Sequence, residues 1–169
     1  VNINNLLNLD ADIDLSMDEL WVKYQRFDNI KSKIKVTKDK VDVYNFGNDK
    51  LKAVADYTIK DKNVNLKANL NAYTVYDTSS LDTNLVVNNM NLELEGPIDN
   101  LKGDLSIDES PLMISSKEVG KLKFDSNIEN SIINIEDFSL RDYNLTGDFN
   151  INTQNFDFNL NLFHIMKKK

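Results

Sequence analysis

Hydrophobic and polar residues alternate along most of this chain, and the alternation is clearest over residues 144–162. Successive side chains of a β-strand point to opposite faces, so this spacing assigns the hydrophobic residues to one side. That side carries Leu145, Gly147, Phe149 and Ile151 and, after a polar turn at residues 153–155, Phe156, Phe158, Leu160 and Leu162. The pattern predicts a β-hairpin with one apolar face and one polar face.

Most other segments repeat this pattern, which predicts an all-β fold. Strands are expected over residues 9–17, 30–36, 41–46, 50–59, 63–73 and 81–95, separated by turns at 38–40, 47–49 and 60–62 and a loop at 76–80. The alternation fails between Met17 and Asn29, where the residues fit either a helical turn or an irregular strand. There, Trp21, Tyr24 and Phe27 are expected to plug a core or cover the apolar face rather than bind a ligand.

The second half of the chain restates the first at a shift of 92 residues, the separation of Phe46 from Phe138. The same shift places Leu15 on Ile107, Tyr57 on Phe149, Ile59 on Ile151 and Leu66 on Phe158, and the turns coincide as well. We therefore predict two tandem repeat units, residues 1–77 and 96–169, joined by a strand or loop at 78–95.

Composition narrows the classes of function. The 169 residues suffice for a sizeable core, and 41% hydrophobic content with 9% aromatic residues argues against disorder. The net charge of −7 argues against a nucleic-acid partner, because phosphate binding needs a basic surface. The absence of cysteine excludes a disulfide scaffold and thiolate metal sites. The sequence contains no run of 18 apolar residues, so it predicts no membrane-spanning helix.

Catalytic and metal-binding motifs find little support in the sequence. His164, the single histidine, has no recognisable nucleophile beside it, so a packing or surface role is expected. Asp10, Asp12 and Asp14 resemble the start of a calcium loop, but Leu15 stands where that loop requires glycine. These aspartates are expected on the solvated face of a strand. We expect no enzyme, no cofactor and no metal site.

Basic residues are concentrated in one part of the chain. Residues 23–67 contain twelve basic and six acidic residues, although the whole chain is acidic. Lys31, Lys33 and Lys35 form an outward stripe that is echoed by Lys121 and Lys123. A solvated face is the expected role, with a phosphate headgroup or an acidic partner as the alternative.

The succession of one-sided strands, with segments such as GPIDNLKGDLSI at residues 96–107 and NLTGDF at 144–149, resembles the AsmA-like/TamB family. The resemblance implies a β-taco, which is an elongated sheet curled into an open trough with an apolar interior. It also implies transport of phospholipids across the bacterial envelope, with an outer-membrane barrel of the Omp85 type as partner. The full-length protein would be periplasmic and anchored in the inner membrane, and the present sequence would be an internal segment.

Two functions follow as expectations. In the first, an apolar groove holds phospholipid acyl chains and is lined by Ile13, Leu15, Ile34, Val36, Tyr57, Ile59, Leu66, Leu105, Ile107, Phe149, Ile151, Phe158 and Leu160. In the second, the chain is a structural or adhesive all-β module whose apolar faces close on a dry core about 10 Å thick. Self-association through exposed edge strands is expected in either case.

Overall fold

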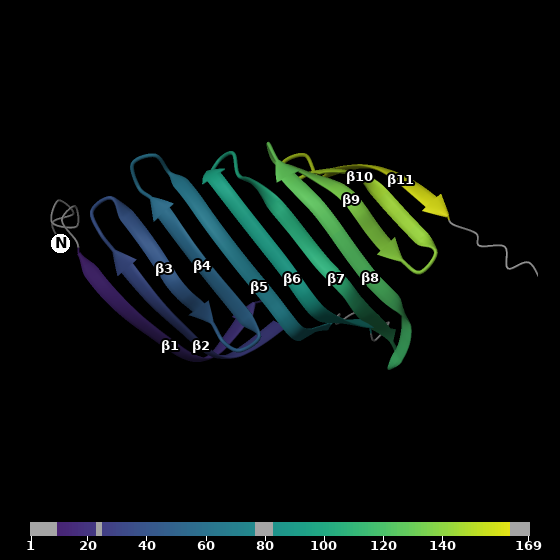
Figure 1. The fold of residues 1–169 in the computed structure, drawn as a ribbon, viewed down its shortest axis with the longest axis horizontal. Coiled ribbons are helices and arrows are strands. Elements are labelled where there is room, and N and C mark those ends of the chain that lie inside the picture. The colour runs from purple at the N-terminus through teal and green to yellow at the C-terminus, as the bar shows by residue number, and fades with distance from the viewer. Residues whose placement is uncertain (1–9, 23–24, 77–82, 163–169) are drawn as a thin grey trace, which may run out of the picture.

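The structure is a computed structural model that describes residues 10–22, 25–76 and 83–162, and its regular elements in these ranges are all strands (Figure 1). They form one antiparallel sheet in which every strand pairs with the next in sequence. The strands are β1 (Ala11–Val22), β2 (Gln25–Val36), β3 (Lys40–Gly47), β4 (Leu51–Thr58), β5 (Asn63–Tyr76), β6 (Thr83–Pro97), β7 (Lys102–Ile114), β8 (Lys117–Glu129), β9 (Ile132–Leu140), β10 (Tyr143–Asn150) and β11 (Asn155–Leu162). The expected elongated, curled antiparallel sheet is confirmed, with β1 and β11 at its two edges.

Paired residues on neighbouring strands point to the same face, so the register can be followed across the sheet. One row of paired residues is apolar on every strand. It runs through Ile13, Ile34, Val43, Ala55, Leu66, Leu94, Gly103, Ile128, Ile133, Phe149 and Phe156. We call the side of the sheet that carries this row the apolar face, and the opposite side the polar face.

The long strands bend where two adjacent residues face outward together. Five of the six longest strands contain a four-residue segment whose first and last side chains are buried or half-buried, while the middle two are exposed except for half-buried Asn89. The segments are residues 17–20, 27–30, 70–73, 87–90 and 107–110. An extra outward residue turns a strand, as a β-bulge does, and returns hydrophobic side chains to the same face. Figure 1 shows the resulting curvature in β1.

Polar contacts join these segments into one line across the sheet, which we call the bend line. The side-chain amide of Asn48, in the turn between β3 and β4, donates to the carbonyl oxygen of Asp28 at 2.7 Å. On the other side of that turn, the main-chain N–H of Asn71 donates to the carbonyl oxygen of Lys50 at 2.8 Å. The line continues where Asn89 Nδ2 lies 2.8 Å from the Asp108 carboxylate.

Beyond the bend line, the end of the β1–β2 hairpin packs against the end of β5. The rings of Phe27 and Tyr73 stack there with their centroids 4.7 Å apart. Strands β2, β5 and β6 supply Ile30, Leu70 and Val87, the only apolar side chains among the described residues that are buried. The core of the sheet is therefore small, and most of the apolar face lies outside it.

The strand bounds follow the 92-residue shift. The shift carries β4 onto residues 143–150, which are the bounds of β10, and carries β2 onto residues 117–128 of β8. It also relates two turn residues with positive φ, Lys62 at 53° and Gln154 at 57°. The expected connection at 78–95 contains most of β6, which pairs with both β5 and β7 as a full member of the sheet.

The structure decides one alternative that the sequence left open, in favour of strand, and corrects several strand bounds. The irregular segment between Met17 and Asn29 is strand up to Val22 and again from Gln25, and no helical turn occurs at the described positions. Residue 76, expected in a loop, ends β5, and the rest of that expected loop lies outside the described residues. β4 ends at Thr58 and β10 ends at Asn150, one residue earlier than the alternation suggested.

Candidate functional site

The apolar face collects most of the residues expected to line a lipid groove. Ile13, Ile34, Leu66 and Phe149 belong to the row that crosses all strands. Leu105 and Phe158 belong to the next row on the same face, and Ile107 and Leu160 belong to the row after that. Leu15, Val36 and Tyr57 share the same face. The two remaining residues, Ile59 and Ile151, lie in turns just past the ends of β4 and β10.

Ile59 and Ile151 occupy equivalent positions in the two repeats and have the same environment. The Ile59 amide donates to the carbonyl oxygen of Asp39 at 2.9 Å, and the Ile151 amide donates to that of Ser131 at 2.9 Å. Their side chains are 43% and 45% exposed. They stand at the rim of the sheet, where the apolar face meets solvent, rather than within a strand.

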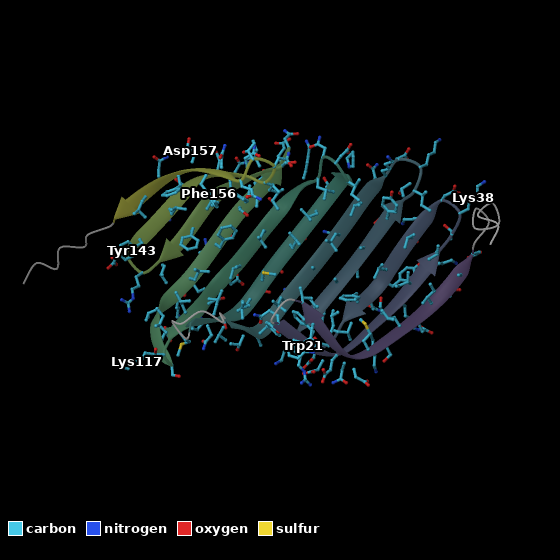
Figure 2. All side chains as sticks on the ribbon, turned by 180° about the vertical axis from the view of Figure 1, so that it is seen from behind. Trp21, Lys38, Lys117, Tyr143, Phe156 and Asp157 are labelled. Atoms are coloured by element: carbon cyan, nitrogen blue, oxygen red, sulfur yellow. The ribbon has the colours of Figure 1, made fainter. Side chains whose placement is uncertain are left out.

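Solvent reaches the apolar face most freely near β11. Phe156, Phe158 and Leu160 are 65%, 55% and 55% exposed, and Figure 2 shows Phe156 on this outermost strand. Phe156 stacks on Phe149 of β10 with ring centroids 4.3 Å apart. Exposed apolar clusters of this kind mark sites of interaction with lipid or protein.

The polar face is organised by lysines that bridge carboxylates. Lys123 Nζ lies 2.6 Å from Asp125 and 3.1 Å from Asp137, on neighbouring strands. The hydrogen bond to Asp125 is the largest cause that raises the pKa of Lys123 above the ordinary range of lysine, and the hydrogen bond to Asp137 is the second. Lys40 bridges Asp42 and Asp56 in the same manner, at 2.7 and 3.5 Å. These bridges offset the repulsion between like charges that oppose each other on paired strands.

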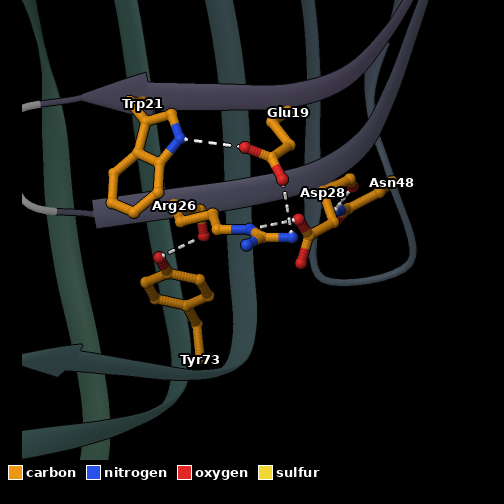
Figure 3. Close-up of polar contacts among 6 residues, drawn as sticks. All are labelled: Glu19, Trp21, Arg26, Asp28, Asn48 and Tyr73. Carbon is orange, nitrogen blue, oxygen red and sulfur yellow. Dashed lines mark hydrogen bonds and ion pairs between the residues drawn. The ribbon is translucent and has the colours of Figure 1, made fainter.

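The end of the β1–β2 hairpin carries a second polar cluster (Figure 3). Arg26 pairs with Glu19 at 2.9 Å and with Asp28 at 2.6 Å, and the hydrogen bond to Asp28 raises the pKa of the guanidinium. Trp21 Nε1 donates to Glu19 at 3.2 Å. Trp21 is 58% exposed and bonds to Glu19, so the expectation that it plugs a core is wrong, whereas Phe27 does pack against Tyr73. Tyr24, the third residue of that expectation, lies outside the described residues.

Groups for catalysis or metal binding do not converge in the described part of the chain. No cluster of three metal-ligating side chains occurs among these residues. Asp12 and Asp14 oppose Lys35 and Lys33 on the polar face of β1 and β2. His164 lies outside the described residues. The described residues also contain no helix of the length and hydrophobicity that crossing a membrane would require.

Sequence reasoning missed the bend line and the packing that it permits. The sequence signal is a pair of polar residues flanked by apolar ones, as in Met17-Asp18-Glu19-Leu20. Residues 107–110 follow the same pattern, except that Ser110 replaces the last apolar residue. Each such segment interrupts strict alternation without ending the strand.

Comparison of the chain with known protein families, with curated proteins and with solved structures finds no match.

Proposed function

We propose that the apolar face holds the acyl chains of phospholipids, and that the chain is a segment of an envelope-spanning lipid-transport protein of the AsmA-like type. The observation that carries this proposal is the apolar row across all eleven strands, which no second layer of the described chain covers. The segment would work in the periplasm, with the full-length protein anchored in the inner membrane. An outer-membrane barrel of the Omp85 type would engage other regions of that protein.

Hydrophobic attraction alone supports such binding. Each methylene group removed from water gains about 0.8 kcal/mol, and the attraction has no directional requirement. Strands spaced about 4.8 Å apart make the apolar row about 48 Å long, so an acyl chain finds equivalent contacts at many positions. A carrier of this kind needs no motif of conserved polar chemistry, and the proposal assigns no reaction to the chain.

The first experiment looks for lipid and for its position. Native mass spectrometry and lipid extraction of the purified protein should recover phospholipid. A phospholipid with a photoreactive group in its acyl chain should label apolar-face residues such as Leu66 and Phe149. Labelling confined to the polar face, or the absence of both bound lipid and labelling, would contradict the proposal.

A pair of substitutions on neighbouring strands provides the control. Leu66 and Val54 are both apolar, but Leu66 pairs with Ala55 on the apolar face while Val54 pairs with Lys67 on the polar face. Leu66→Asp should reduce recovered lipid at least about tenfold, because a carboxylate is costly against hydrocarbon. Val54→Asp should leave acyl-chain labelling of Phe149 unchanged, because Val54 lies on the polar face. Circular dichroism must show the sheet intact in both variants, and Phe149→Asp provides a second test if Leu66→Asp unfolds.

A structural or adhesive module is the second candidate, favoured by the exposed aromatic residues of β11. In that case another protein chain, rather than lipid, would cover Phe156 and Phe158. A lipid-free preparation that binds a protein partner through the apolar face, and whose binding is insensitive to detergent, would favour this candidate.

A further inference from the structure

The polar face carries a hollow of about 510 Å³ over strands β2 to β6. Lys31, Lys52 and Lys67 border this hollow. Its floor is the backbone at Ala53 and Ala68, whose side chains pair with each other on the apolar face. The hollow is thus open to solvent on the side of the sheet that the lipid proposal does not use.

Lys31 and Lys52 stand on either side of Gly47 in one row of paired residues. The strand spacing places their backbones about 10 Å apart, and glycine leaves the space between them empty. A Cβ atom at Gly47 would lie 1.8 Å from the carbonyl oxygen of Leu51, and φ is +134°. Only glycine fits this position, so the backbone itself keeps the gap between the two lysines open.

The two lysines also lack the partners that other lysines of the polar face possess. Lys67 pairs with Glu93 at 2.8 Å, and that hydrogen bond raises the pKa of Lys67. Neither Lys31 nor Lys52 forms an ion pair within the described part of the chain. The hollow therefore holds two positive charges that no carboxylate neutralises at contact distance.

The second repeat shows the same position in a neutralised form. The 92-residue shift carries Lys31, Lys33, Asn45 and Lys52 onto Lys123, Asp125, Asp137 and Asn144. In that set, Lys123 pairs with both aspartates at 2.6 and 3.1 Å, and Asn144 Nδ2 donates to Asp137 at 2.6 Å. The first repeat thus carries three positive charges and no negative charge where the second carries one positive and two negative charges.

We propose that the hollow between β2 and β6 binds an anion that bears a phosphate group, with Lys31 and Lys52 as its principal contacts. The phosphate would occupy the electrostatic position that the carboxylates of Asp125 and Asp137 occupy in the second repeat. Lysine binds phosphate as a point charge on a flexible stem, which suits two ammonium groups carried by strands two positions apart in the sheet. Because the hollow lies on the polar face, this site does not depend on acyl-chain binding.

Titrations monitored by amide chemical shifts test the site and identify the source of the phosphate. Inorganic phosphate and pyrophosphate, added at low salt, should shift the amides of Gly47 and Lys52 but not those of Ser139 and Asn144, and added salt should weaken the effect. Phosphatidylcholine vesicles with and without phosphatidylglycerol form the second arm. Shifts with the anionic vesicles alone would assign the site to lipid headgroups, and shifts with neither probe would overturn the proposal.

Exchanging residues between the repeats gives a matched control. The triple variant Lys33→Asp, Asn45→Asp, Lys52→Asn copies the second repeat into the first and should lower pyrophosphate affinity at least about tenfold. The reverse variant Asp125→Lys, Asp137→Asn, Asn144→Lys should create pyrophosphate-dependent shifts around Lys123. Unchanged affinity in the first variant, measured with its sheet intact by circular dichroism, would overturn the proposal, and Lys31→Gln with Lys52→Gln repeats the test with minimal change.

Discussion

Phe27 and Tyr73 stack with ring centroids 4.7 Å apart although β3 and β4 lie between their strands in the sheet. The contact is possible because β3 and β4 end at the turn over residues 48–50, while β2 and β5 continue past it. Tyr73 Oη adds a hydrogen bond of 2.7 Å to the carbonyl oxygen of Arg26 (Figure 3). This pair closes one end of the sheet over the small core.

The first prediction concerns the polar part of this closure. Tyr73→Phe should lower the free energy of unfolding by about 1 kcal/mol, because it deletes one hydrogen bond and keeps the ring. A double-mutant cycle of Phe27→Ala and Tyr73→Ala should give a coupling energy of about 0.5–1.5 kcal/mol for the stacked rings. Urea denaturation measures both. Tyr143→Phe, at a 53% exposed side chain, should change little, and zero coupling in the cycle would show that the stack does not form.

The second prediction concerns the core. Ile30 is fully buried, so Ile30→Ala should cost about 2–5 kcal/mol through lost burial and the cavity left behind. Ile13→Ala, at a 44% exposed position on the same face, should cost much less. Chemical denaturation of the two variants in parallel checks the difference, and equal costs would place the core elsewhere.

The third prediction concerns pH. The folded-state pKa of Lys123 is raised, first by its hydrogen bond to Asp125, so its stabilising effect is present at neutral pH. That effect should disappear as the pH rises through the raised pKa. Heteronuclear NMR of the Nζ group should show Lys123 still protonated at a pH where an ordinary lysine has lost its proton. Asp125→Asn should lower this pKa, and an ordinary value in the unsubstituted protein would contradict the bridge.

The fourth prediction concerns the open edge at β11. An edge strand carrying exposed Phe156, Phe158 and Leu160 should pair with other chains along its outer side, giving self-association that rises with concentration. Phe158→Lys should reduce it, because lysine on an edge strand opposes edge-to-edge pairing. Sedimentation velocity measures the effect, with Val54→Lys on an interior strand as the control. A strict monomer at high concentration would refute the prediction.

Alternation was sufficient to predict the strands and the division of the sheet into two faces, because a strand buried on one side repeats its polarity every second residue. It could not predict that the β1–β2 hairpin packs against β5, because that contact depends on the short strands β3 and β4 stopping at a turn that β2 and β5 extend beyond. It also misplaced Trp21, because an indole ring can lie exposed beside Glu19 as readily as in a core.

The candidate sites divide in the same way. Eleven of the thirteen expected lining residues fall on the apolar face because register follows from alternation. Ile59 and Ile151 do not lie in strands, because the chain turns one residue before the alternation stops. Alternation could not predict the hollow beside Gly47, because only the pairing of β2, β3 and β4 brings Lys31 and Lys52 into one row.

The consecutive strand order has a consequence for how the protein assembles. Partners in the sheet come from adjacent stretches of chain, and even the Tyr73–Arg26 hydrogen bond spans only 47 residues. Short loops close quickly, so the sheet can grow hairpin by hairpin and its N-terminal half can form while the remainder is still being synthesised. Pulling on the two edges should correspondingly peel the strands away one after another instead of unfolding the molecule in a single step.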